Sequence, residues 1–277
     1  MVRHRNATGT IRGGSELRSP GNGSSVPPTP ETVALLADGA MEIVMSRLNS
    51  DAESVGELHG CLSDEERQRA SRFAFDLDRR RFIVARARLR QLLAARLDLQ
   101  PGSVELRYGA RGKPALARRG TAPDLRFNVS HADDIAVYAF SIGREIGIDI
   151  EAVREMKCAD EITAKCFSKR EREMYFSLDP RDRAEGFFNC WTRKEAFIKA
   201  LGDGFYHALD RFDVSLTPGE PARILRMDDT PGDDCGWRLD SFCPAPGYVA
   251  AVVTERRQRR GEFVVSAPRL ATLATAP

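Results

Sequence analysis

The sequence predicts an α+β fold built from two halves of similar size. The first observation is the order of the expected elements, which runs strand, helix, strands and then strand, helices, strands. The second is a pair of capping-box patterns, Ser63-x-x-Glu66 and Ser168-x-x-Glu171, each at the expected start of a helix. The third is size, since 277 residues of which 42 % are apolar suffice for a proper core in one large domain or two small ones.

The two ends of the chain are not expected to join this fold. Residues 1–40 are predicted to form a disordered extension, because residues 1–30 contain Gly, Ser, Pro and Arg and cannot bury much apolar surface. Residues 256–277 are expected to form a tail. The chain between them divides into an N-terminal α+β half, 41–144, and a C-terminal α+β half, 145–255. No internal repeat is clear enough to prove a duplication.

In the first half, a helix should open at Ser63. A second helix is expected over 79–97, where apolar residues recur near helical spacing, and Pro101-Gly102 ends it. Gly109 to Pro114 is a loop punctuated by glycine and proline. The expected strands cover 42–48, 104–108, 125–129 and 135–141.

In the second half, a strand over 146–151 comes first and the second capping box then opens a helix. A further helix is expected from about 183 to 201. The remaining expected strands cover 212–216, 237–242 and 248–253.

Composition narrows the class of protein. Lys+Arg is 42 and Asp+Glu is 40, and this near balance argues against a whole-protein nucleic-acid binder. No run of about 18 apolar residues appears, so no membrane span is expected. The N-terminus lacks the apolar region of a secretory signal, and the six cysteines include no Cys-x-x-Cys pair. We therefore expect reduced thiols in a cytoplasmic protein.

Two carboxylates share one face of the strand expected over 146–151. Because side chains alternate along a strand, Asp149 and Glu151 lie on the face opposite to the three isoleucines, roughly 6 to 7 Å apart. Carboxylates held side by side repel unless a cation lies between them. One interpretation is a magnesium site, since oxygen ligands favour that ion. The alternative is an ordinary solvated strand face.

A third carboxylate falls inside an apolar helical stripe. Glu195 lies four residues after Trp191 and three before Ile198. A carboxylate on a packing face is costly unless it is paired or bound to metal. Lys194 and Lys199 flank it, so the alternative is a surface helix with a Glu195–Lys199 ion pair.

Three further polar segments have both a phosphate-binding interpretation and a structural or surface one. Lys113 precedes Pro114 in a turn that proline stiffens, and such turns are also common on surfaces. Ser130 and His131 close a strand, where a histidine can donate to a phosphate or serve the structure. The Arg-rich segment 79–90 is either a solvated helix face, a nucleic-acid stripe or a binding surface for a small polyanion.

Together these pieces resemble the Sfp-type 4′-phosphopantetheinyl transferases, over residues 42 to 253. Order and spacing agree with that family. The segments 147–151 and 191–199 are highly specific when they occur together. The matching segments are Gly112-Lys113-Pro114, Phe127-Asn128-Val129-Ser130-His131, Phe167-Ser168 with Glu171, Gly147-Ile148-Asp149-Ile150-Glu151 and Trp191-Thr192-Arg193-Lys194-Glu195-Ala196-Phe197-Ile198-Lys199.

The resemblance implies two similar α/β-sandwich halves related by a pseudo-twofold axis, with coenzyme A bound between them. It implies that magnesium is held by Asp149, Glu151 and Glu195, and that Glu195 and Lys199 serve the reaction. The coenzyme A contacts that it implies are Lys113 and Pro114 at the adenine nucleotide, Ser130 and His131 near the 3′-phosphate and pyrophosphate, Arg69 and Arg81 at the nucleotide phosphates, and Lys194 at the pyrophosphate.

The implied activity is magnesium-dependent transfer of 4′-phosphopantetheine from coenzyme A to a serine of an acyl- or peptidyl-carrier protein. A monomer is the default, because two halves in one chain can build the site, and no nucleic acid or membrane is expected as a partner. Lys169, Arg170 and Arg172 are candidates for docking an acidic carrier, although a solvated helical turn explains them equally well. The competing hypotheses are a non-catalytic coenzyme A or nucleotide-binding module and a nucleic-acid-binding protein.

Overall fold

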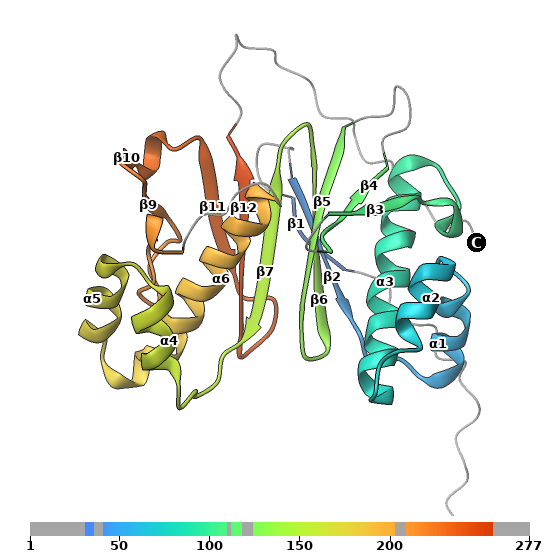
Figure 1. Ribbon diagram of the computed structural model, residues 1–277, viewed down its shortest axis with the longest axis horizontal. Coiled ribbons are helices and arrows are strands. Elements are labelled where there is room, and N and C mark those ends of the chain that lie inside the picture. The colour runs from blue at the N-terminus through green and yellow to red at the C-terminus, as the bar shows by residue number, and fades with distance from the viewer. Residues whose placement is uncertain (1–30, 36–40, 110–111, 118–123, 203–208, 257–277) are drawn as a thin grey trace, which may run out of the picture.

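The computed structural model describes residues 31–35, 41–109, 112–117, 124–202 and 209–256. Its helices and sheets form four layers, with the long helices α3 and α6 on the outer faces of two sheets that lie back to back (Figure 1). The mixed α and β content that the sequence predicts is therefore confirmed. The pseudo-twofold relation between the halves stays a prediction.

The first half consists of a four-stranded antiparallel sheet in the order β1-β2-β6-β5, with three helices on one face and a small β3-β4 hairpin beside it. Val44, Tyr138 and Phe140 of the sheet pack against Val84 and Leu93 of α3 in one core cluster. The elements are β1 (Glu31–Leu35), β2 (Met41–Arg47), α1 (Ala52–His59), α2 (Asp64–Ala70), α3 (Asp76–Leu97), β3 (Leu106–Tyr108), β4 (Pro114–Leu116), β5 (Leu125–Ala132) and β6 (Ile135–Ile142).

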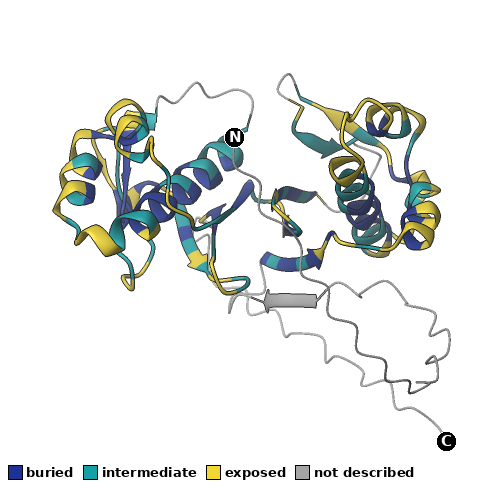
Figure 2. Cartoon of the chain, turned by 90° about the horizontal axis from the view of Figure 1, so that it is seen from below, coloured by how far each residue is buried: buried dark blue, intermediate teal, exposed yellow. Residues whose placement is uncertain are grey.

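The second half consists of a three-stranded antiparallel sheet in the order β11-β12-β7, with α6 along one face, and a smaller sheet in the order β10-β9-β8. Figure 2 shows the helices buried along the sides that face the sheets and exposed on their outer sides. The elements are β7 (Ile146–Ala152), α4 (Ala159–Cys166), α5 (Lys169–Ser177), α6 (Arg183–Leu201), β8 (Phe212–Val214), β9 (Ile224–Met227), β10 (Thr230–Pro231), β11 (Trp237–Phe242) and β12 (Tyr248–Glu255).

A separate core cluster joins the two halves. Ile146, Ile148 and Ile150 of β7 pack there with residues of β2, β6 and β12, such as Ile43 and Val137. The predicted alternation of β7 is therefore confirmed, because its three isoleucines share one buried face. Burial of this many branched side chains fixes the position of one sheet against the other.

Several boundaries differ from the prediction. Within the expected extension 1–40, Glu31–Leu35 form β1, which pairs antiparallel with β2. Without β1, β2 would be an edge strand with unpaired backbone groups, and β1 supplies their hydrogen-bond partners. The rest of that extension, and residues 257–277 of the expected tail, lie outside the described residues. The short helices α1 and α4 were not predicted, since neither carries a capping box. Both predicted capping boxes are present.

Two global features bear on the expected class. No helix in the described part of the chain is long and apolar enough to cross a membrane. All six cysteines are free thiols in the structure.

Candidate active site

The close approach of α6 to β7 builds the site. Gly147 leaves room for it, since a Cβ atom at this position would lie 2.1 Å from the carbonyl oxygen of Ala196. Glycine is therefore required at this crossing. Asp149 follows on the same face of β7, and Glu195 and Lys199 lie on α6 beside it. Asp149 is only 5 % exposed, which rules out a solvated strand face at this residue.

Asp149 binds two side chains through one oxygen. Lys199 Nζ donates to Asp149 Oδ1 at 2.6 Å, and Ser130 Oγ donates to the same atom at 2.8 Å. Lys199 Nζ also donates to Ser130 Oγ at 3.0 Å. The other oxygen, Asp149 Oδ2, is buried and has no hydrogen-bond partner within the described residues. A buried carboxylate oxygen without a partner is uncommon in proteins and indicates a place for a ligand.

Glu151 and Glu195 lie within electrostatic range of Asp149. Burial, followed by the charge of Asp149, raises the pKa of each of these carboxyl groups. The charge of Glu195 also raises the pKa of Glu151. A cation shared with Asp149 would stabilise the ionised forms of Glu151 and Glu195.

The structure does not present these carboxylates as an assembled metal centre. Among the described residues, no group of three or more His, Cys, Asp or Glu side chains has the arrangement of a metal site. The prediction that the three acids converge on one point is thus not met in this conformation, because Lys199 supplies the positive charge at Asp149. The donor set still fits magnesium, since Asp149 Oδ2 lacks a partner in the described part of the chain and all the candidate ligands are carboxylate oxygens.

Lys113 joins the site from the first half of the molecule. Gly112 has a positive φ of 76°, and the turn that it forms carries Lys113 to the end of α6. There Lys113 Nζ donates to the backbone carbonyl of Lys199. Pro114, the first residue of β4, pairs with Tyr108 of β3 and anchors the turn. The predicted placement of a cation at this turn is consistent with the geometry.

His131 lies where the two halves meet, next to the end of β5. Loss of solvent, followed by the positive charges of Lys199, Arg81 and Arg86, lowers the pKa of its imidazole. Ser130, one residue earlier, contacts Asp149 as described. Arg69 is further out on the surface, with its guanidinium 5.3 Å from the ring centroid of Phe82.

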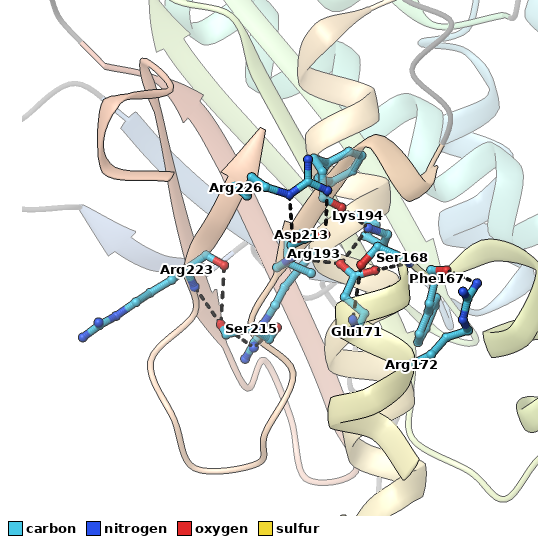
Figure 3. A network of polar contacts seen from close by, with 12 residues as sticks. Phe167, Ser168, Glu171, Arg172, Arg193, Lys194, Asp213, Ser215, Arg223 and Arg226 are labelled. Atoms are coloured by element: carbon cyan, nitrogen blue, oxygen red, sulfur yellow. Dashed lines mark hydrogen bonds and ion pairs between the residues drawn. The ribbon is translucent and has the colours of Figure 1, made fainter. Parts of the chain in front are cut away.

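Lys194 is the predicted site residue that the structure places elsewhere. Its ammonium donates to Glu171 Oε1 and to the carbonyl of Phe212, both at 2.7 Å, and its side chain is 1 % exposed (Figure 3). Along a helix, Lys194 is roughly 100° from Glu195, whereas Lys199 is roughly 40° from it. Lys194 is therefore corrected from a pyrophosphate contact to a structural cation that fixes α6 to α5 and β8.

The Arg-rich helix is also not a uniform solvated face. Arg88 and Arg90 are buried, and Arg90 forms an ion pair with buried Glu66 at 2.5 Å. Glu66 was not predicted as an ionic partner, because its capping-box role already explained it. Of the three basic residues considered for carrier docking, Lys169 and Arg170 are exposed. Arg172 instead donates to the carbonyl oxygens of Ala164 and Phe167.

Comparisons with known proteins cover both halves. Residues 145–253 match the family model described as 4′-phosphopantetheinyl transferase superfamily, and residues 50–142 match the model described as 4′-phosphopantetheinyl transferase, N-terminal. The 4′-phosphopantetheinyl transferase HetI of Nostoc is 37 % identical over 227 residues, which cover 81 % of this chain and 91 % of that protein.

Two Bacillus proteins are similar at greater distance. The 4′-phosphopantetheinyl transferase Sfp of Bacillus subtilis is 28 % identical over 69 % of this chain and 81 % of its own length. The 4′-phosphopantetheinyl transferase psf-1 of Bacillus pumilus is 30 % identical over 74 % of this chain and 83 % of its own length.

Proposed function

The chain belongs to the 4′-phosphopantetheinyl transferase superfamily, and we propose that it transfers the 4′-phosphopantetheine group of coenzyme A to a serine of an acyl- or peptidyl-carrier protein. The serine oxygen forms a bond to the phosphorus that carries pantetheine, and the bond from that phosphorus to the adenosine side breaks. Adenosine 3′,5′-bisphosphate leaves. The observation that carries the proposal is the buried Asp149 carboxylate, which binds Lys199 through one oxygen and has no partner for the other among the residues that the structure describes.

Asp149, Glu151 and Glu195 would hold a magnesium ion. Their oxygen-only chemistry supports this assignment, and so do the raised pKa values of Glu151 and Glu195, each caused first by burial and then by the charge of Asp149. When bound, the ion supplies positive charge that neutralises the oxygens of the diphosphate.

Lys199 has two roles in this account. In the structure, its ammonium lies 2.6 Å from Asp149 Oδ1 and neutralises that carboxylate. Its side chain is 29 % exposed, so its ammonium can leave the carboxylate and donate to a phosphate oxygen where negative charge develops. Lys113 donates to the backbone carbonyl of Lys199 and so stabilises the end of α6, the helix that carries Lys199.

Glu195 is the proposed acceptor of the serine proton, either directly or through a water that it orients. Burial and the neighbouring Asp149 raise the pKa of its carboxyl group, which brings its basicity closer to neutral pH. The coenzyme would extend from this point toward His131, Arg81 and Arg69 of the first half, with Lys113 and Pro114 at its adenine nucleotide.

The decisive experiment is mass spectrometry of apo-carrier proteins incubated with this protein, coenzyme A and magnesium. Carriers of fatty-acid, polyketide and nonribosomal-peptide synthesis should be compared, since the site does not distinguish them. We expect the mass of one phosphopantetheine on one serine of at least one carrier. Binding of coenzyme A without transfer to any carrier would instead indicate a non-catalytic binding module.

A further inference from the structure

β5 and β7 are edge strands of different sheets that lie side by side at the centre of the molecule (Figure 1). β5 is the last strand in the order β1-β2-β6-β5, and β7 is the last in the order β11-β12-β7. Among the described strands, each therefore has one edge with which no strand pairs. Backbone groups along such an edge need other partners where the edge is buried.

Asn128 supplies one of these partners. Its Oδ1 accepts from the backbone N–H of Ile148, in the interior of β7, at 2.9 Å. Both residues are buried, so this N–H would be costly to leave without an acceptor. An amide side chain of the first sheet thus takes the place that a backbone carbonyl of a neighbouring strand would have beside β7.

The same face of β5 carries a second link to β7. Ser130 lies two residues after Asn128, so the two side chains point the same way. Ser130 Oγ donates to Asp149 Oδ1 at 2.8 Å, and Asp149 directly follows Ile148 in β7. Two neighbouring side chains on one face of β5 therefore hold two adjacent residues of β7, one by its backbone and the other by its carboxylate.

The two links fix how far β7 lies along β5. An N–H···O hydrogen bond persists only over distances of about 2.7 to 3.2 Å, whereas successive residues of a strand are about 3.3 Å apart. Asp149 Oδ1 also accepts from Lys199 Nζ at 2.6 Å, and its Oδ2 has no partner among the described residues. A shift of β7 by a fraction of a residue would separate Asp149 from Ser130 and move the oxygen that is available to a cation.

We propose that Asn128 is a positioning residue, whose amide oxygen holds β7 against β5 at the place where the Asp149 carboxylate can bind magnesium. The inference rests on the proposed function, because it requires that Asp149 binds the ion. Asn128 acts through the backbone of Ile148 and is not itself a proposed ligand. The sequence assigned Ser130 and His131 to the coenzyme, but it gave no role to Asn128 in the same segment.

The test measures the Kd of the full-length protein for manganese, a reporter of magnesium sites, by electron paramagnetic resonance without coenzyme A. Asn128→Leu removes the acceptor at nearly unchanged volume. We expect its Kd to rise about tenfold or more, as is typical when a residue that orients a metal ligand is lost, and carrier modification below saturating magnesium to fall by a similar factor. The Kd for coenzyme A in EDTA should stay within about twofold, because none of the proposed coenzyme contacts lies on β7.

Asn189→Leu is the matched control. Asn189 is also buried and bonds a backbone group, since its Nδ2 donates to the carbonyl oxygen of Leu216 at 3.3 Å in the core of the second half. Urea denaturation should show a lowered midpoint for both Asn128→Leu and Asn189→Leu, because each loses one buried hydrogen bond. The Kd for manganese should change only in Asn128→Leu, which a purely structural role of Asn128 does not explain.

Two further variants isolate the acceptor atom. Asn128→Asp keeps an oxygen within reach of the Ile148 N–H and adds a negative charge that favours a cation, so its Kd for manganese should not exceed the wild-type value. Asn128→Ser is too short for the bond and serves if Asn128→Leu does not fold. Its Kd should rise as expected for the leucine variant.

An unchanged Kd for manganese in Asn128→Leu and Asn128→Ser would overturn the inference, and so would a tenfold higher Kd in Asn128→Asp. Failure of the wild-type protein to bind manganese and to modify any carrier would instead contradict the proposed function. The two failures are thus distinguishable.

Discussion

Two lysine–carboxylate pairs on the same helix, five residues apart, have opposite characters. Lys194 and Glu171 are 1 % and 0 % exposed, and every polar atom that they bury is used. Glu171 also accepts from the backbone N–H groups of Val214 and Ser168, both at 2.8 Å. Lys199 and Asp149 are closer, at 2.6 Å, but the lysine is 29 % exposed and Asp149 Oδ2 has no partner within the described residues.

The difference separates a structural ion pair from a functional one. A fully satisfied pair has no capacity left for a ligand, and breaking it costs folding energy. A pair with an exposed cation and an unused oxygen can exchange partners, because the lysine can move and the carboxylate can accept a metal. Distance alone does not reveal this, since the two pairs differ by only 0.1 Å.

The largest expected effect is at the functional pair. Asp149→Asn should reduce carrier modification by about a thousandfold or more, because it removes the charge around which the site is built. The melting temperature should change little, since Ser130 can still donate to the amide oxygen. The measurement is initial rate by mass spectrometry, with Asp240→Asn on β11 as a control that should keep the wild-type rate. A wild-type rate in Asp149→Asn would remove the proposed site.

At the structural pair, the effect should appear in folding. Lys194→Met leaves Glu171 buried and charged, and should lower the free energy of unfolding by about 3 to 5 kcal/mol. The rate per folded molecule should stay within about twofold. Urea denaturation would measure the first quantity, and the double variant Glu171→Gln/Lys194→Met should recover part of the loss. Native stability combined with a raised KM for coenzyme A would return Lys194 to the binding site.

Lys199→Met should change catalysis and metal binding in opposite directions. Transfer should fall about a hundredfold, because charge stabilisation at the phosphate is lost. The affinity for magnesium in the absence of coenzyme A should rise a few-fold, since the ammonium no longer competes for Asp149. Calorimetry would test this against Lys165→Met, an exposed lysine of α4 that should have no effect. Weaker metal binding in Lys199→Met would contradict the exchange of partners.

A smaller effect concerns the pH dependence of stability. Burial and Asp149 raise the pKa of Glu195 in the folded state, so its contribution to stability is present below its unfolded pKa and is lost as pH rises through the folded pKa. Glu195→Gln is neutral at every pH. In the presence of EDTA, it should therefore melt roughly 1 to 3 °C above the wild type at pH 7, and the gain should vanish near about pH 4. A gain that instead grows toward acid pH would contradict this sign.

Strands and helices with a clear period were predictable from the sequence. β7 and the helix that carries Glu195 agree closely with the predicted ranges, because their apolar residues recur at the period of the element. β6 also agrees, but there the signal is a continuous apolar run. β1 was missed, since it depends on pairing with β2 rather than on its own pattern. The starts of α3 and β3 also differ by a few residues, as is usual where no cap marks a boundary.

The candidate site was predictable where residue spacing alone decides it. Asp149 and Glu151 two apart on a strand, and Glu195 and Lys199 four apart on a helix, must share faces. The prediction that Lys194 contacts the pyrophosphate was wrong. It followed the match to a motif lysine and did not consider that Lys194 and Glu195 point in different directions from the helix. Asn128 received no role, because its bond to the backbone of Ile148 arises only when the edges of two sheets meet.

Metal occupancy tests the central claim most directly. Manganese can report on a magnesium site through its electron paramagnetic resonance spectrum, and titration in the presence of coenzyme A would count the ions bound per chain. We predict one ion for the wild type and for the folded fraction of Lys194→Met, and loss of that ion in Asp149→Asn. Undiminished manganese binding by Asp149→Asn would contradict the account.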